Sequence, residues 1–496
     1  MNRLAQIKRV SICMLLSCLL VAPLTAAELP GEKLAEVKIE KGWLSEKNAS
    51  QLYEEHLLHQ AIEVYKMTLP ALNMVGMRDG SHGQFGSGNH VLPIWKDRMD
   101  GRTLVNTPNA DVIYGMGYLD LKKDGPVVVY APPGVIGLFD DFMQRPLTDV
   151  GLSGPDGGKG GLYLLLPPDY QGHVPGGYYT FRSATYNVFL FWRMVLTQGP
   201  DGPETAKGVA AAEQTLIYPL SKAFMLDRPK MEFPNASFVP VNMQVSKGFA
   251  YWQKLKALID YEPVEFLAPE VRGMLAAIGI IKGQPFAPDN RTEQILTRAA
   301  ELAPKTILAA RMQKKPQEAA RYYKDRQWSN VFAGVDANWM KPSYLDTELR
   351  AAFFQFAYSA APAMVVGTIN KGAKYPATNL DADGNLLRGE NRYRMHIPPD
   401  IPVWLYWAVT AYNPYDGSMQ ITGQKFPTVN SLDKLAYNED GSIDLYFGPD
   451  QPEGVDPHNW IQTLPDKVFL LGFRLYGTKL AFFTKEWKPD DVVRLK

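Results

Sequence analysis

The sequence contains almost no cysteine. Its only two cysteines in 496 residues are Cys13 and Cys18, and both lie in an apolar segment near the N-terminus. If that segment is removed, the remaining chain has no disulfide, no cysteine nucleophile and no cysteine metal ligand. Its stability must then come from hydrophobic cores, which the length and the 46% content of hydrophobic residues allow.

The sequence also has no excess of charge of either sign. The 52 lysines and arginines equal the 52 aspartates and glutamates in number, and the basic residues form no long run. Nucleic acids are polyanions, and the proteins that bind them usually present basic patches. The composition is typical of a globular protein and argues against a nucleic-acid partner.

Residues 1–27 have the three parts of a secretory signal. MNRLAQIKR is basic, VSICMLLSCLLVAPL is apolar but short for a membrane span, and LTAA offers small residues for cleavage near Ala26 or Ala27. We therefore expect export to the periplasm and no stable membrane span. The LLSC sequence that ends at Cys18 resembles a lipoprotein cleavage site, so an outer-membrane lipoprotein is the alternative.

Hydrophobic spacing divides the chain after the signal into four regions. Residues 28–101 are predicted to form an N-terminal segment with a helix over 50–77 followed by loop. Residues 102–202 contain short apolar or alternating runs, such as VVVYAPP and LYLLLPP, which predict a first β-module of the sandwich or barrel type. Residues 203–366 have helical spacing, and residues 367–496 return to strands separated by turn sequences such as DADGN and NEDGS.

The predicted architecture is a β-rich α+β fold, in which two antiparallel β-modules are separated by a helical region. Within the helical region, Pro304 and Pro316 are expected to break or bound the helix whose pattern begins at Arg291. No short-period repeat or low-complexity tract interrupts this order.

A glycine-rich segment, DFMQRPLTDVGLSGPDGGKGG at residues 141–161, is the most unusual stretch of the first β-module. It does not match a nucleotide-binding P-loop, because Gly160 follows Lys159 where that motif requires Ser or Thr to meet the magnesium ion. Two interpretations remain. The backbone N–H groups of the loop bind an anion, or the segment is a long exposed turn. Loops of this length inside a compact domain are uncommon and often functional.

Motifs for nucleophilic catalysis and for metal binding are absent or incomplete. No GxSxG sequence occurs. His56 and His59 are three residues apart, but the HLLH sequence lacks the glutamate of the HExxH motif. DADGN at residues 381–385 begins like a calcium loop without the rest of the twelve-residue pattern, so a β-turn is the better interpretation. We therefore predict no metal site.

Longer segments of the chain resemble a bacterial two-module family. NTPNADVIYGMGYLDLKKDGPVVVYAPPG at 106–134, together with the segment 141–161, resembles the domain of unknown function 1254. PVWLYWAVTAYNP at 402–414, NEDGSIDLYFGPDQPEG at 438–454 and RLYG at 474–477 resemble its usual C-terminal companion, the domain of unknown function 1214. The likeness covers most of the chain after the signal and keeps the same order.

This resemblance implies two β-sandwich-like modules, the second in the jelly-roll style, with helices between and around them. It implies no particular activity, cofactor or catalytic residue. One departure is visible at YDGSM, residues 415–419, where relatives tend to have a threonine-arginine-serine turn. A role of that arginine therefore does not transfer to this chain.

Polar residues in the first β-module are denser than turns alone require, so we expect a ligand site there. The expected partner is a small molecule that is polar or carbohydrate-like, and the sequence names no cofactor. The predicted ligand contacts are Asn106, Asn109, Gln144, Arg145 and Lys159, and the candidates for acid–base catalysis are Asp111 and Asp149.

Three functions are compatible with this expectation. A periplasmic hydrolase or lyase requires a deep pocket with converging charges and perturbed pKa values. A non-catalytic module that binds glycan or envelope components requires exposed aromatic side chains in a shallow groove. An assembly protein, such as a homo-oligomer of jelly-roll modules, requires a large apolar patch. We favour a ligand-binding protein, with or without catalysis.

Overall fold

The computed structural model describes residues 30–332 and 334–496. The predicted signal, residues 1–27, lies outside the described residues. The chain divides into two compact units, with the boundary between Glu55 and His56. Before this boundary lie the short helix α1 (Glu32–Ala35) and the first residues of the long helix α2 (Glu46–Phe85).

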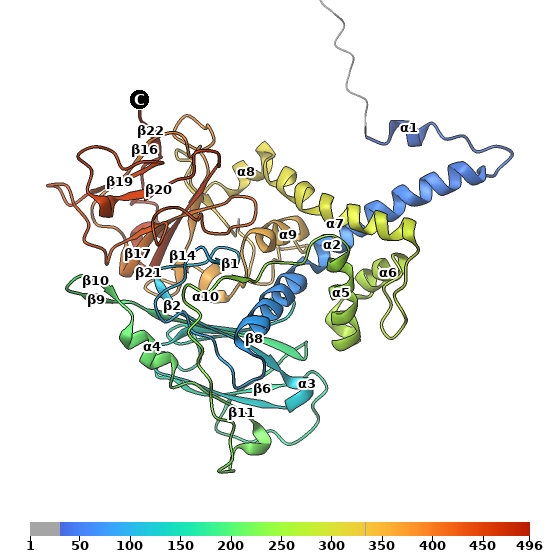
Figure 1. The fold of residues 1–496 in the computed structure, drawn as a ribbon, viewed down its shortest axis with the longest axis horizontal. Coiled ribbons are helices and arrows are strands. Elements are labelled where there is room, and N and C mark those ends of the chain that lie inside the picture. Colours follow the sequence, from blue (N-terminus) through green and yellow to red (C-terminus); the bar gives the residue numbers. More distant parts are fainter. Residues whose placement is uncertain (1–29, 333) are drawn as a thin grey trace, which may run out of the picture. The chain divides into compact units, whose positions relative to one another are not determined.

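Helix α2 is longer than the sequence predicted (Figure 1). The expected helix ended at residue 77, but the structure continues it to Phe85, so the prediction of loop for residues 78–85 was wrong. The prediction took the glycines near the end of this helix as turn residues, but a glycine without a side chain also lets another backbone segment approach a helix closely. A Cβ atom on Gly76 would lie 2.4 Å from the Gln244 carbonyl oxygen, and one on Gly80 would lie 2.1 Å from that of Asn242. The helix therefore continues because another segment packs directly on its glycine face.

The first β-module contains two four-stranded sheets. Residues that alternate along β2 and β8 point to opposite faces, as the pleat of a strand requires. Ile113 and Leu190 join a core shared with the second of these sheets, whereas Tyr114 and Phe191 join a core shared with the helices and the other module. The first sheet has the order β2 (Val112–Asp120), β8 (Asn187–Val195), β4 (Ile136–Asp141), β5 (Pro146–Val150), and the second has the order β11 (Leu216–Pro219), β3 (Val127–Ala131), β6 (Gly161–Leu166), β7 (Tyr179–Arg182).

The boundary of this module differs from the prediction. Strand β11 pairs antiparallel with β3, although residues 216–219 lie in the region predicted to be helical. The helical spacing of that segment belongs only to α4 (Ala206–Ala212), and the LIYP sequence after it completes the sheet. Most pairs are antiparallel as expected, but β6 and β7 pair in parallel. Short elements in this part of the chain are β1 (Thr103–Leu104), α3 (Leu121–Asp124), β9 (Thr197–Gly199), β10 (Gly202–Glu204) and β12 (Val241–Asn242).

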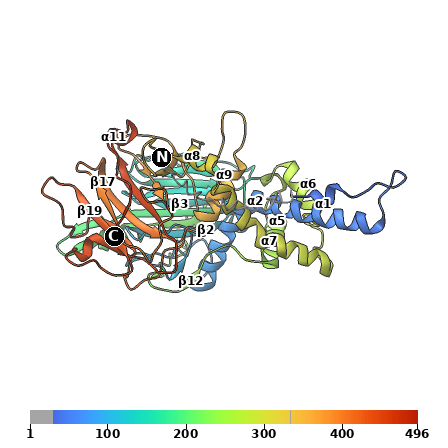
Figure 2. The ribbon, with the colours of Figure 1, turned by 90° about the horizontal axis from the view of Figure 1, so that it is seen from above.

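The region between the modules is helical, as predicted (Figure 2). Pro304 lies inside α7 without ending it, so the expectation of a break there was wrong. The proline removes one backbone donor, but Ala299, Ala303 and Ile307 remain buried on the same helix and continue its packing. The helices are α5 (Phe249–Tyr261), α6 (Pro269–Ala277), α7 (Asn290–Arg311), α8 (Lys314–Ala320), α9 (Thr347–Phe356) and α10 (Pro362–Val365).

The second β-module is built around a long antiparallel pair, β17 and β21. One face of this pair contributes Trp407 and Phe473 to the core of the module, and the other contributes Tyr406 and Tyr476 to the core shared with the first module. DADGN forms a turn, as predicted. One sheet contains β13 (Ser329–Asn330), β14 (Ala373–Lys374), β15 (Pro376–Thr378), β21 (Leu470–Thr478), β17 (Val403–Tyr412) and β18 (Thr428–Asn430), and the other contains β20 (Trp460–Gln462), β19 (Ile443–Gly448), β16 (Tyr393–Ile397) and β22 (Val493–Arg494).

The coarse fold class is confirmed: the protein is α+β with several antiparallel sheets. The finer assignment of a sandwich and a jelly roll stays a prediction. Within residues 30–332 and 334–496, none of the helices combines the length and the apolar character that a membrane crossing requires.

Candidate anion-binding site

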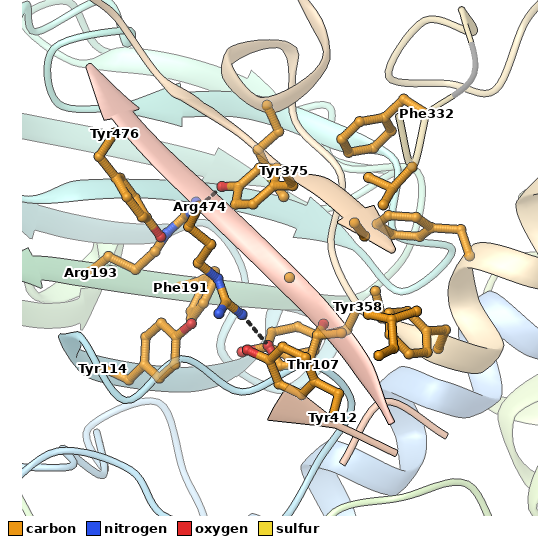
Figure 3. Close-up of a pocket in the computed structure, with 18 residues that line it drawn as sticks. Thr107, Tyr114, Phe191, Arg193, Phe332, Tyr358, Tyr375, Tyr412, Arg474 and Tyr476 are labelled. Carbon is orange, nitrogen blue, oxygen red and sulfur yellow. Dashed lines mark hydrogen bonds between the residues drawn. The ribbon is translucent and has the colours of Figure 1, made fainter. Parts of the chain in front are cut away.

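A cavity of about 100 Å³ lies where the first sheet of the first β-module faces the β17–β21 pair of the second (Figure 3). We call it the interface cavity. Its walls come from the two modules and from the segments around α9 and α10, which are far apart in the sequence. The lining residues are Thr107, Tyr114, Phe191, Arg193, Val331, Phe332, Phe353, Phe356, Ala357, Tyr358, Met364, Tyr375, Ala377, Tyr412, Leu470, Gly472, Arg474 and Tyr476.

Two arginines line this cavity from opposite modules. Arg193 lies on β8 beside Tyr114 of β2, and Arg474 lies on β21 beside Ala408 of β17. Strand alternation places Phe191 on the same face as Arg193, so the face that carries the arginine is otherwise apolar. Each arginine is only 6% exposed. Both sequences, FLFWRMV and LLGFRLYG, therefore bury an arginine in the middle of an apolar strand.

Neither arginine has a carboxylate partner in an ion pair within the described part of the chain. The Nη1 atom of Arg193 lies 3.5 Å from the Tyr375 hydroxyl, and its buried Nε atom has no hydrogen-bond partner. Arg474 donates from Nη1 to Thr410 Oγ1 and from Nη2 to the carbonyl oxygens of Thr107 and Pro108. A buried cation without a counterion is costly, because water that would solvate the charge is absent.

Tyrosine hydroxyls surround the two guanidinium groups. Burial raises the pKa of Tyr114, Tyr358 and Tyr375 above the usual range of tyrosine. These hydroxyls are therefore neutral near pH 7 and serve as hydrogen-bond donors rather than as bases. Together with two arginines, they form a cationic wall that is rich in donors. Such a wall is complementary to an anion, and especially to a carboxylate, which a guanidinium can bind through two parallel hydrogen bonds.

The other end of the cavity is apolar. Figure 3 shows nitrogen and oxygen atoms gathered around Arg193, Arg474 and Tyr114, with the labelled ring of Phe332 away from the two arginines. The rings of Phe332 and Phe353 pack on each other and on Trp339, which holds this wall in place. The apolar lining residues are Val331, Phe332, Phe353, Phe356, Ala357, Met364, Ala377 and Leu470.

Asn106, Asn109 and Asp111, which the sequence predicted as site residues, are buried and have partners within the protein. Asn106 donates to the Gln355 carbonyl oxygen. Asp111 accepts hydrogen bonds from Arg98, Thr428 and Asn430, and thus ties the first module to the second. Asn109 donates to the hydroxyl of Tyr476, a residue of the cavity wall, so Asn109 orients part of that wall without lining the cavity.

Gln144 and Asp149 are also bound to neighbouring backbone. Gln144 donates to the Pro70 carbonyl oxygen and accepts from the Ser359 N–H. Asp149 accepts from the Ala363 N–H, next to the cavity residue Met364. Burial raises the pKa of Asp149 to about 6, although the Ala363 N–H and the charge of Arg193 oppose the rise. Asp149 therefore has the titration of an acid–base catalyst, but it does not line the cavity.

Arg145 and Lys159 lie outside the cavity wall as well. Lys159 is exposed. Arg145 donates from Nε to Asp141 Oδ2 at 2.6 Å, and its buried Nη2 atom has no partner. Arg350 lies near enough that burial and the charge of Arg145 lower the pKa of Arg350 to about 10. The structure thus separates the predicted ligand contacts instead of bringing them to one point.

Sequence reasoning missed Arg193 and Arg474. The signal that identifies them is a lone arginine in a strand whose other residues are apolar on both faces, which indicates burial of a charge. Among the described residues, no three or more His, Cys, Asp and Glu side chains lie close enough together to hold a metal ion.

Comparisons with protein families identify both modules. Residues 90–219 match the family described as Protein of unknown function (DUF1254), and residues 372–480 match the family described as Protein of unknown function (DUF1214). The chain therefore contains both modules in the order that the resemblance predicted. The first match ends at the last residue of β11, in agreement with the module boundary seen in the structure.

A similar solved structure supports the fold, and a second match is weaker. The crystal structure of the VPA0106 protein from Vibrio parahaemolyticus is 17% identical to this chain and gives a TM-score of 0.52, covering 89% of this chain and all of its own. A putative uncharacterized protein from Burkholderia cenocepacia is 13% identical with a TM-score of 0.40, covering 94% of this chain and 93% of its own. A comparison with curated proteins finds no match.

Proposed function

We propose that this protein binds a small organic anion, of the carboxylate class, in the interface cavity. The observation that carries the proposal is the pair of buried guanidinium groups, Arg193 and Arg474, that line one cavity without a carboxylate partner among the described residues. A bound anion would supply the missing counterion and accept the hydrogen bonds of the surrounding tyrosines. From the predicted export signal, we further propose that this binding takes place in the periplasm.

The site supports binding more directly than catalysis. Its tyrosines are neutral near pH 7 and its arginines cannot give up a proton, so the lining offers no general base. Hydrolase or lyase activity therefore needs a further group, such as Asp149, a predicted acid or base whose pKa burial raises to about 6. An uncharged carbohydrate would leave both arginines without a counterion, so we favour an anion over the carbohydrate-like ligand expected from sequence.

A larger cleft of about 500 Å³ lies between α2, α5 and β2 and supports a ligand less well. Its lining contains three cations and three carboxylates, so the charges balance: Arg78, Lys123 and Lys254, with Asp79, Asp120 and Asp124. Arg78 and Lys254 both form ion pairs with Asp79, at 2.9 and 2.6 Å. A ligand there would have to compete with ion pairs that the protein already makes. In the interface cavity, Arg474 donates only to uncharged acceptors and the buried Nε atom of Arg193 has no hydrogen-bond partner.

Thermal unfolding with matched charged and neutral ligands tests the proposal. Benzoate should raise the melting temperature of the protein, and the neutral amide benzamide of nearly the same shape should not. At 100 times its dissociation constant, a ligand adds about 2.7 kcal/mol to stability. Arg193→Met and Arg474→Met should each abolish the response to benzoate. Equal responses to benzoate and benzamide, or a full response in both variants, would disprove anion binding in this cavity.

A second candidate function is an interaction with a partner or a second copy of the chain. Three consecutive apolar side chains, Phe224, Met225 and Leu226, are 98%, 50% and 107% exposed in the loop after β11. Isolated exposed apolar residues are common, but a run of this exposure is typical of contact surfaces. Analytical ultracentrifugation of the wild type and of a Phe224→Ser, Leu226→Ser variant would test it. An identical monomeric mass for both proteins would remove the case for a homo-oligomer.

A further inference from the structure

A second cavity of about 120 Å³ adjoins the interface cavity. We call it the outer cavity. The two cavities share three lining residues, Phe332, Met364 and Tyr375. These three side chains therefore form the junction between them. A ligand that is too long for the interface cavity would meet this junction first.

The wall of the outer cavity has apolar and polar parts. Besides the shared residues, it includes the apolar Val365, Pro376, Phe482 and Phe483 and the polar Tyr322 and Asn330. Its one ammonium group belongs to Lys374, which donates to the carbonyl oxygens of Met364 and Val366 at 2.8 Å each. Lys374 thus stabilises the C-terminal end of α10, and its ammonium group donates to the cavity wall rather than to a ligand.

The junction is suited to admit a flexible apolar chain. Met364 is unbranched and only partly buried, and a methionine side chain can change rotamer at low cost to widen a gap. Phe332 on the opposite side is held by Phe353 and Trp339 and is 4% exposed. One side of the junction is therefore adaptable and the other is fixed.

We infer that the ligand is an amphipathic anion, with its acid group at Arg193 and Arg474 and an apolar body that passes Met364 into the outer cavity. This inference rests on the proposed function and adds a substrate class to it. The two linings support it. The interface cavity offers guanidinium groups and tyrosine hydroxyls beside aromatic and aliphatic side chains, and the junction residue Tyr375 contacts Arg193. The outer cavity offers further apolar side chains beyond the junction, and a short polar anion would leave these apolar surfaces uncovered.

Calorimetric titration with straight-chain monocarboxylates tests the inference on the wild-type chain. Acetate, butanoate, hexanoate, octanoate and decanoate differ only in the number of methylene groups. Each methylene that becomes buried should tighten binding about fourfold, until the outer cavity is filled. Equal affinity for acetate and octanoate would overturn the amphipathic ligand while leaving anion binding intact. Lack of binding by every carboxylate would contradict the proposed function itself.

Protein variants test whether the hydrocarbon chain of the ligand passes Met364 into the outer cavity. Met364→Trp should fill the junction, so that butanoate binds as in the wild type and the gain from butanoate to octanoate falls to less than threefold. Met312→Trp places the same change at a side chain that is 55% exposed elsewhere, and the full gain should remain. Arg193→Met should weaken every member of the series, which separates specific binding from adhesion of apolar tails.

An unchanged octanoate gain in a folded Met364→Trp protein would overturn the path through the junction. If that variant does not fold, as judged by circular dichroism, the length series on the wild type still decides the inference, because it requires no substitution.

Discussion

Arg193 on β8 and Arg474 on β21 approach one cavity from different β-modules, and each is 6% exposed without an ion pair to a carboxylate in the described part of the chain. Proteins rarely bury charge in this way, because the lost hydration of a guanidinium is not recovered from neutral hydrogen-bond partners alone. Residues that destabilise the ligand-free fold are commonly retained for binding or catalysis. The stability of the fold does not explain the burial of these two arginines, so we take them as the basis of the proposed binding function.

Removal of Arg193 should not destabilise the ligand-free protein. Arg193→Met replaces a buried charge that has no ion pair by an apolar side chain of similar length, so the free energy of unfolding should be unchanged or raised by up to about 2 kcal/mol. Urea unfolding in a buffer without organic acids measures this. A loss of several kcal/mol would show that Arg193 stabilises the ligand-free fold.

A second arginine provides the matched control for this experiment. Arg98, whose side chain is 12% exposed, forms an ion pair with the fully buried carboxylate of Asp111 at 3.1 Å. Arg98→Met leaves that carboxylate without its cation, so stability should fall by about 3–5 kcal/mol. The same substitution is therefore expected to have opposite consequences at the two positions, according to whether a carboxylate is present.

The pH dependence of stability should contain a contribution from Asp149. Burial raises its folded-state pKa to about 6, above about 3.9 in the unfolded chain. Between these two values the folded state keeps a proton that the unfolded state has lost, so this group makes stability fall as pH rises from about 4 to 6. The loss is complete above that window and amounts to about 3 kcal/mol at most.

Asp149→Asn removes this titration and keeps an oxygen that can accept from the Ala363 N–H. The variant should therefore gain stability relative to the wild type as pH rises from about 4 to 6, when both are followed by chemical unfolding. Asp201→Asn, at a side chain that is 94% exposed, is the control and should give a curve parallel to that of the wild type. A parallel curve for Asp149→Asn as well would show that the carboxylate is not perturbed.

Arg145 is expected to stabilise its loop rather than bind the ligand of the interface cavity. Its Nε atom and its N–H both donate to Asp141, a residue that is 2% exposed. Arg145→Ala should cost about 1–3 kcal/mol, which is less than for a fully buried pair because the Arg145 side chain is 41% exposed. Asp141→Asn in the same chain should restore part of the loss, and the double-mutant cycle measures the coupling.

The same variant also decides between the two roles of Arg145. A normal response to benzoate in Arg145→Ala would confirm a structural role. A lost response at unchanged stability would instead support the ligand contact that the sequence predicted, and would direct attention to Arg145 and its neighbour Arg350.

Elements whose pattern is local were the easiest to predict. The segments VVVYAPP, LYLLLPP and VFLLGFRLYG cover β3 and nearly all of β6 and β21, because a strand buried on both faces leaves a continuous apolar run in the sequence. The failures have a tertiary cause. Helix α2 continues through Gly80 because residues 242–243 pack on it, and β11 is a strand because β3 offers it a pairing edge. Residues 242–243 and strand β3 are distant in the sequence from the segments they pack against, so the local pattern of those segments could not indicate them.

The candidate site also could not be predicted from local sequence patterns. The polar residues predicted from the sequence are near one another along the chain, but none of them lines the interface cavity, and most of their side chains have hydrogen-bond partners within the protein. The cavity takes Arg193 from one module and Arg474 from the other. Each arginine could have been recognised as unusual, since a charge in an apolar strand is rare, but nothing in either strand indicates that the two side chains meet.

Composition, hydrophobic spacing and resemblance thus established the order of the modules, the α+β class and most strands, because these depend on interactions within a few residues and on the alternation of a pleated backbone. The cavity, with its two arginines and its apolar side chains, arises only when sheets from two modules pack face to face. Packing of that kind depends on contacts between residues hundreds of positions apart. An arginine that would be hydrated on a strand by itself becomes a buried charge only after that packing has excluded the surrounding water.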